Sequence, residues 1–192
     1  MTWVYACDHR HTGLTFPEVT RLVGGKAANL AVMSVDLELP VPPAFTITTD
    51  ACNEYLAHGW PAGLDDELSE HMARIEDLVG RRFGDPANPL LVSVRSGAAI
   101  SMPGMMDTIL NLGLNDKTVR GLEAQTGNPR FAWDCYRRFI AMFGNVVKGI
   151  DKEAFEAALR QVKAAADVQS DADLSTQALQ KLVGIFQNIY KE

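Results

Sequence analysis

The sequence predicts an α+β protein in which a mixed first half is followed by a small all-helical second half. Two observations support this class. Short apolar or β-branched runs bounded by glycine and proline occur before Gly113, between segments with helical spacing. After Gly113 only helical periodicities remain. We therefore expect one subdomain over residues 1–115 and an all-helical subdomain over residues 116–192.

In the first half, strands are expected at the runs richest in apolar and β-branched residues, which are 1–6, 45–48 and 90–94. Thr49 or Asp50 is expected to cap a helix that ends near His58. Apolar residues recur at helical spacing over residues 65–79, so a further helix is expected there, and Gly80 ends it. We interpret its apolar stripe as core packing.

The second half is expected to contain four helices, over residues 116–125, 131–143, 151–166 and 175–191. Asp116 is the expected cap of the first of them. The second is rich in aromatic residues and is the expected centre of the helical core. Four of its residues are spaced to share one side: Trp133, Tyr136, Arg137 and Ile140.

Composition narrows the classes of partner. The chain of 192 residues has a formal net charge of −6 and no basic stripe, so a nucleic-acid surface is not expected. No apolar run approaches the roughly 18 residues of a membrane span, so no membrane partner is expected. The three cysteines are widely spaced and form no CxxC pair, which is typical of free thiols in a reducing cytoplasm.

The segment from Leu90 to Asp107 contains the first candidate site. The apolar run 90–94 is interpreted as a short buried strand that ends in Arg95, and the polar loop 96–107 follows it. A guanidinium group at a strand end and the N–H groups of a glycine-containing loop suit a phosphate. The alternative is an arginine that merely leaves the core at the end of a strand.

The second candidate is Gly24-Gly25-Lys26, where a helix is expected to start at Ala27. A lysine at a helix start after a tight turn suits a phosphate, because amides and an ammonium group converge there. The spacing differs from a Walker A loop, and Ala27 stands where that motif has serine or threonine. A solvated lysine at a helix start is the alternative.

Three potential metal ligands alternate near the start of the chain, namely Cys7, His9 and His11. On an extended segment they would share a face. No fourth ligand is near them in the sequence, so we favour ordinary exposed histidines over a metal site.

Four segments, taken in order, closely resemble the N-terminal region of the pyruvate, phosphate dikinase family. They are VGGKAANLAVM, LPVPPAFTITTDAC, LLVSVRSGAAISMPGMMDTILNLGLND and TGNPRFAWDCYRRFI. The stretch SMPGMMDTILNLGLND is long and specific, whereas GGK and VRS alone would also suit the related phosphoenolpyruvate synthases. The resemblance covers essentially the whole chain.

The resemblance implies a partial ATP-grasp nucleotide-binding subdomain before the helical one. The family forms phosphoenolpyruvate, AMP and pyrophosphate from pyruvate, ATP and phosphate, through a phosphohistidine on a separate swivelling domain. Its motifs imply that Lys26 and Arg95 contact ATP phosphates as catalytic and binding residues. They also imply that the SMPGMMD loop closes over the ligand, with Ser101, Gly104 and Met106 near it. Mg²⁺ would accompany ATP.

Two positions depart from the family pattern. Ala27 replaces a glycine, which a helix start tolerates. Ala99 replaces a second arginine, and a lost charge-assisted bond of this kind is worth about 1.5–3 kcal/mol.

The resemblance also implies that the magnesium ligands, the phosphorylated histidine and the pyruvate domain lie outside these residues. We therefore expect a fragment that is inactive alone and whose partners are ATP, phosphate and the missing C-terminal domains. Full-length members are typically homodimers. The alternative is a non-catalytic helical interaction module on a degenerate nucleotide-binding scaffold, and Ala99 favours it slightly.

Overall fold

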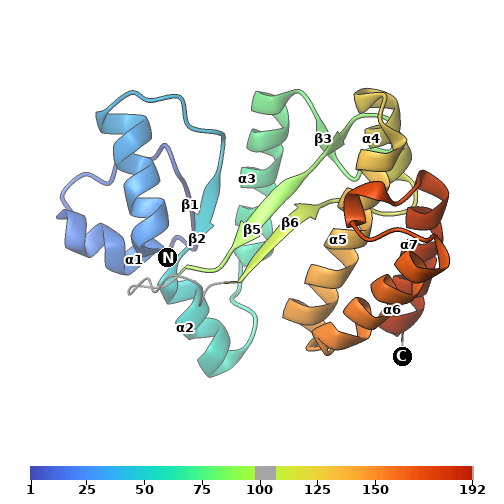
Figure 1. Cartoon of the computed structure of the whole chain (residues 1–192). Coiled ribbons are helices and arrows are strands. Elements are labelled where there is room, and N and C mark those ends of the chain that lie inside the picture. Colours follow the sequence, from blue (N-terminus) through green and yellow to red (C-terminus); the bar gives the residue numbers. More distant parts are fainter. Residues whose placement is uncertain (98–106, 192) are drawn as a thin grey trace. The chain divides into compact units, whose positions relative to one another are not determined.

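The computed structural model describes residues 1–97 and 107–191, which mix helices and short strands as expected for an α+β protein (Figure 1). They divide into two compact units. Unit 1 comprises residues 1–80 and 96–106, and unit 2 comprises residues 81–95 and 107–192. This division differs from the expected subdomain boundary after residue 115, because the strands after residue 81 belong to unit 2. Compactness alone does not test the subdomain assignment, which stays a prediction.

In its described residues, unit 1 has one antiparallel pair of strands and three helices. The strands are β1 (Val4–Ala6) and β2 (Phe45–Ile47), with Tyr5 opposite Thr46. The helices are α1 (Phe16–Ala31), continued by a π-helical turn over Val32–Asp36, α2 (Thr49–His58) and α3 (Leu64–Val79). Both strands and the last two helices were predicted. The cap of α2 is Thr48, one residue earlier than expected, and its hydroxyl accepts from the N–H of Ala51.

The first part of α1 was missed by the sequence analysis. The helix begins after Thr15, and the Glu18 carboxylate accepts from both the N–H and the hydroxyl of Thr15. This Thr-x-x-Glu arrangement is a capping box, and Pro17 in the first turn favours the same start. The signal was therefore present in the sequence over residues 15–18.

Helix α3 is tied to β1 by polar contacts. One carboxylate oxygen of Glu67 accepts from the backbone N–H groups of Trp3 and Val4, each at 2.8 Å. The guanidinium of Arg74 donates to both carboxylate oxygens of Asp8. The apolar stripe of α3 was expected to be core, but only Leu64 is fully buried and the rest is half-buried or exposed. These polar contacts therefore add to a limited apolar interface.

Unit 2 begins with two short pairs of strands. In the parallel pair, β3 (Arg82–Phe83) lies beside β4 (Pro89–Leu90), and in the antiparallel pair β5 (Val92–Arg95) lies beside β6 (Thr108–Leu112). The expectation of a fully buried strand over residues 90–94 is wrong. Leu90 is buried, but Val94 is 46% exposed. The reason is that β5 pairs only with β6 among the described strands, so it forms a two-stranded ribbon rather than the centre of a sheet.

The rest of unit 2 is helical, as predicted. The helices are α4 (Thr118–Thr126), α5 (Pro129–Lys148), α6 (Lys152–Ala165) and α7 (Thr176–Lys191), with a 3₁₀ turn over Asp171–Asp173 before α7. Figure 1 shows α5, α6 and α7 side by side. The predicted side of α5 is buried in their core. None of the described helices is long and apolar enough to cross a membrane.

Asp116 is not the cap of α4. The side chain of Asn115 accepts from the N–H groups of Lys117 and Thr118 instead. Asp116 accepts from Tyr136 and Gln187, so its carboxylate lies on the α5 and α7 side. Both residue types are good caps, and the tertiary contact decides between them.

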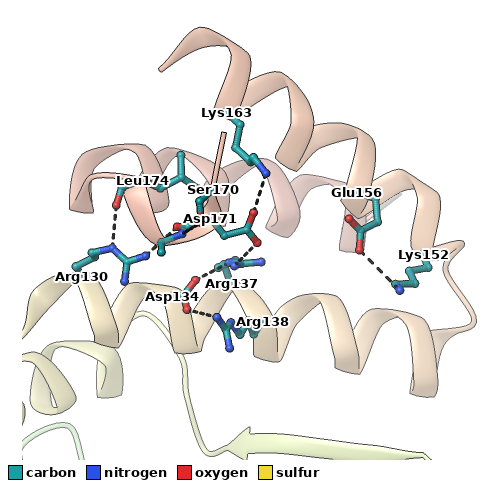
Figure 2. A network of polar contacts seen from close by, with 11 residues as sticks. Arg130, Asp134, Arg137, Arg138, Lys152, Glu156, Lys163, Ser170, Asp171 and Leu174 are labelled. Atoms are coloured by element: carbon teal, nitrogen blue, oxygen red, sulfur yellow. Dashed lines mark hydrogen bonds and ion pairs between the residues drawn. The ribbon is translucent and has the colours of Figure 1, made fainter. Parts of the chain in front are cut away.

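A network of ion pairs joins α5 to the 3₁₀ turn (Figure 2). Arg137 donates to Asp134 at 2.8 Å and to Asp171 at 2.9 Å. Arg138 pairs with the other oxygen of Asp134, and Lys163 of α6 pairs with the other oxygen of Asp171. The buried arginine predicted on α5 is thus neutralised by two carboxylates, which is the condition for burying a charge at acceptable cost.

Candidate functional site

The Gly24-Gly25-Lys26 turn interrupts α1. Gly24 has a φ of 80° and a ψ of 155°, a conformation essentially restricted to glycine, and the helix restarts after it. Lys26 is therefore near the start of a helical segment, as the sequence predicted. Such a start leaves the first backbone N–H groups without intrahelical acceptors and carries the positive end of the helix dipole.

Contacts on both sides hold this turn. The two residues that follow Lys26 are buried in the core of unit 1 with Val19 and Val23. Asn29 donates from its side-chain amide to the carbonyl oxygen of Gly25 at 2.7 Å. The sequence analysis did not single out Asn29. The signal that points to it is its position four residues after Gly25, on the same face of the restarted helix.

The side chain of Lys26 is exposed, and its ammonium group donates to the carbonyl oxygen of Ser96 at 3.3 Å. Ser96 belongs to unit 1 and follows Arg95 in the chain. Within unit 1, the ammonium group of Lys26 thus lies against Ser96, a residue of the Leu90–Asp107 candidate segment. An exposed ammonium group retains two further donors for an anion.

Arg95 is the last residue of β5, in antiparallel register with Thr108 of β6. Its side chain is exposed, and no carboxylate within residues 1–97 and 107–191 forms an ion pair with it. The guanidinium fork is therefore not neutralised within the described part of the chain. Lys26 lies in unit 1 and Arg95 in unit 2, so the convergence of the two cations on one anion stays a prediction.

The predicted loop residues Ser101, Gly104 and Met106 lie outside the described residues. The same holds for Ala99, the departure from the family pattern. Their proposed roles stay predictions that rest on the resemblance.

The alternative metal site at Cys7, His9 and His11 gains no support. Cys7 is buried, and burial together with the nearby Asp8 carboxylate raises the pKa of its thiol to about 11. The ring centroids of His9 and His11 are 4.8 Å apart, and both rings pack on Tyr5. Within the described ranges, no three His, Cys, Asp or Glu side chains are arranged to hold a metal ion. All three cysteines are free, as predicted.

Comparison with known families assigns a class to the segment around Lys26. The family model described as "Pyruvate phosphate dikinase, AMP/ATP-binding domain" matches residues 20–62. This range contains the Gly24 kink, Lys26 and Asn29. The matched segment is therefore similar to part of a nucleotide-binding domain.

Curated relatives extend the likeness to almost the whole chain. It is 52% identical over 173 residues to the chloroplastic pyruvate, phosphate dikinase 1 of Oryza sativa subsp. japonica, covering 89% of this chain and 18% of the relative. Over 192 residues it is 48% identical to the pyruvate, phosphate dikinase of Rhizobium meliloti and 46% identical to that of Clostridium symbiosum, covering 99% of this chain and 21% of each relative.

The chain therefore matches the N-terminal AMP/ATP-binding region of pyruvate, phosphate dikinases. It spans about a fifth of the length of these relatives.

Proposed function

We propose that this chain forms the first part of the ATP-binding site of a pyruvate, phosphate dikinase. The observation that carries the proposal is the identity of 46–52% over at least 89% of the chain to three proteins of that name. The proposed fold of the complete domain is ATP-grasp. The proposed reaction forms phosphoenolpyruvate, AMP and pyrophosphate from pyruvate, ATP and phosphate through a phosphohistidine.

In this proposal, Lys26 and Arg95 neutralise the phosphates of ATP. Phosphoryl transfer requires that negative charge on the phosphate oxygens be stabilised and that the reacting groups be held in line. Lys26 supplies an ammonium group beside the N–H groups that follow the Gly24 kink. Arg95 supplies a planar donor fork that is not occupied by a described carboxylate. The loop residues Ser101, Gly104 and Met106 would close over the ligand.

Mg²⁺ would supply positive charge to the ATP phosphates, and acidic side chains in the parts of the relatives that this chain does not span would hold it. The phosphorylated histidine and the pyruvate site would lie in the parts of the relatives that this chain does not span, so the chain alone is proposed to be inactive. Its proposed partners are those domains and a second copy of the full-length enzyme. Its proposed compartment is the cytoplasm, which the three free thiols support.

Calorimetric titration of Mg-ATP tests the proposal. The wild-type chain is expected to bind, and Lys26→Ala and Arg95→Ala are each expected to weaken binding about tenfold or more, because each removes a charge-assisted contact worth about 1.5–3 kcal/mol. Lys181→Ala and Arg160→Ala are matched controls that remove exposed cations of unit 2. They are expected to leave the affinity unchanged.

The alternative of a non-catalytic interaction module predicts equal, negligible binding by the wild type and Arg95→Ala. A second titration with a C-terminally extended chain separates that outcome from a site that needs its second half. Binding that appears on extension and is lost again in Arg95→Ala supports the proposed function. No binding by the extended chain contradicts it.

A further inference from the structure

Unit 2 contains a pocket whose lining residues lie outside both candidate phosphate motifs. It has a volume of about 330 Å³ and is lined by residues of α5 and α7, together with Leu114 and Asp116. This volume is within the range of small-molecule sites, which begins at about 300 Å³. Tyr136 and Ile140 of α5 and Gln187 of α7 are among its lining residues.

A closed triangle of hydrogen bonds forms the polar end of this pocket. The Tyr136 hydroxyl donates to Oδ1 of Asp116 at 3.0 Å. The side-chain amide of Gln187 donates to the same oxygen at 2.7 Å and to the Tyr136 hydroxyl at 3.1 Å. Because an ionised carboxylate only accepts hydrogen bonds, the amide nitrogen of Gln187, and not its oxygen, must face Asp116.

The triangle engages the Tyr136 hydroxyl proton, and Nε2 of Gln187 donates to both of its neighbours. Oδ2 of Asp116 and Oε1 of Gln187 accept no hydrogen bond from residues 1–97 or 107–191. The polar end therefore offers two unused acceptor oxygens, one of which belongs to a carboxylate. Burial is the main reason that the pKa of Tyr136 rises to about 12, so its proton stays in place at neutral pH.

The rest of the pocket is largely aromatic. The ring centroids of Phe139 and Phe143 are 5.6 Å apart, and those of Phe143 and Tyr190 are 6.3 Å apart. Lys148 lies over the ring of Tyr190, and Lys191 completes the rim. The apolar ring of a ligand would fit such walls. The ligand would need a hydrogen-bond donor only where it faces Asp116.

We propose that this pocket binds a small aromatic compound that carries a primary ammonium group on a short chain. The aromatic body lies against Phe139, Phe143 and Tyr190, and the ammonium group donates to the unused acceptors of Asp116 and Gln187. An aromatic carboxylate of the same size is disfavoured at this end of the pocket, because its charge would face the carboxylate of Asp116. The proposal does not depend on the proposed function of the chain.

NMR titration of the full chain with phenethylamine tests this inference. Backbone amide shifts are expected to saturate together in residues 136–143 and 187–191. Titration with 3-phenylpropionate, which has a carboxylate in place of the ammonium group, is expected to show at least about threefold weaker binding at these amides. No saturable shifts in these segments, or equal affinity for the two probes, would overturn the proposal.

Two variants and one control locate the interaction. Asp116→Asn keeps the side-chain shape and is expected to weaken phenethylamine binding at least about threefold, the size expected for an exposed charge pair. Tyr190→Ala removes an aromatic wall and is expected to weaken both probes. Asp66→Asn, which removes an exposed carboxylate of α3, is expected to change neither. Unchanged binding in a folded Asp116→Asn variant contradicts the assignment.

Discussion

Replacing Arg137 by methionine tests how far the ion pairs between α5 and the 3₁₀ turn stabilise unit 2. The change keeps most of the side-chain volume but removes the donors to Asp134 and Asp171. Breaking a buried ion pair costs about 3–5 kcal/mol when the remaining charge is left alone. Here Asp134 keeps Arg138 at 2.8 Å and Asp171 keeps Lys163 at 3.0 Å. We therefore expect a smaller loss of unfolding free energy, about 2–3 kcal/mol.

Urea unfolding of the full chain, followed by circular dichroism, measures this loss. Arg160→Met is the matched control, because its ion pair with Glu153 lies on the surface of α6. It is expected to change the unfolding free energy by less than about 1 kcal/mol. If Arg137→Met were no more destabilised than this control, the stabilising role of the network would be refuted.

The pH dependence of the stability difference between the wild type and Arg137→Met gives a second test of this network. Burial opposes ionisation of Asp171, but the contacts from Lys163 and Arg137 prevail and lower the pKa of this carboxyl below its ordinary value. A carboxyl with a lowered folded-state pKa stabilises the protein above its unfolded-state pKa, about 3.9. That contribution is lost as pH falls through the folded-state pKa. The stability difference between wild type and Arg137→Met is therefore expected to narrow below about pH 4.

Three further predictions follow from backbone geometry and burial. Gly24→Ala is expected to cost about 1–3 kcal/mol in urea unfolding, because alanine at a φ of 80° and ψ of 155° is strained. Gly121→Ala is expected to cost about 1–3 kcal/mol, since its Cβ would lie 2.3 Å from a backbone carbonyl oxygen, while Gly184→Ala, which has open space, should cost nothing measurable. In thiol labelling of the native protein, the exposed Cys52 is expected to react first, and Cys7 only on unfolding, because burial raises its pKa to about 11.

Hydrophobic periodicity, together with glycine and proline positions, was sufficient to predict the mixed helix and strand class and most of the helices. Apolar spacing located α3 and α5 to α7, and Gly80 ends α3 as expected, in the left-handed conformation. The buried strand over residues 90–94 was predicted wrongly, because an apolar run does not reveal whether other strands or helices cover its faces. Asp116 was misassigned for a related reason: local capping preference competes with a tertiary partner that is 20 residues away in the chain.

Some parts of the candidate site could be predicted from the sequence and others could not. The Gly24 turn and the position of Lys26 follow from local chemistry, because a glycine pair before a helical pattern predicts a tight turn. Asn29 was missed, since its contact with Gly25 follows from the kinked geometry rather than from a motif. Whether Arg95 and Lys26 act on one anion depends on long-range arrangement, which periodicity does not encode.

The most direct test of the central claim is an NMR titration of the chain with Mg-ATP that follows the backbone amides of residues 24–27 and 95–97. If both segments contribute to one phosphate site, their shifts will move together and saturate at the same ATP concentration. ATP-induced shifts confined to other surfaces, or separate affinities for the two segments, would contradict the account.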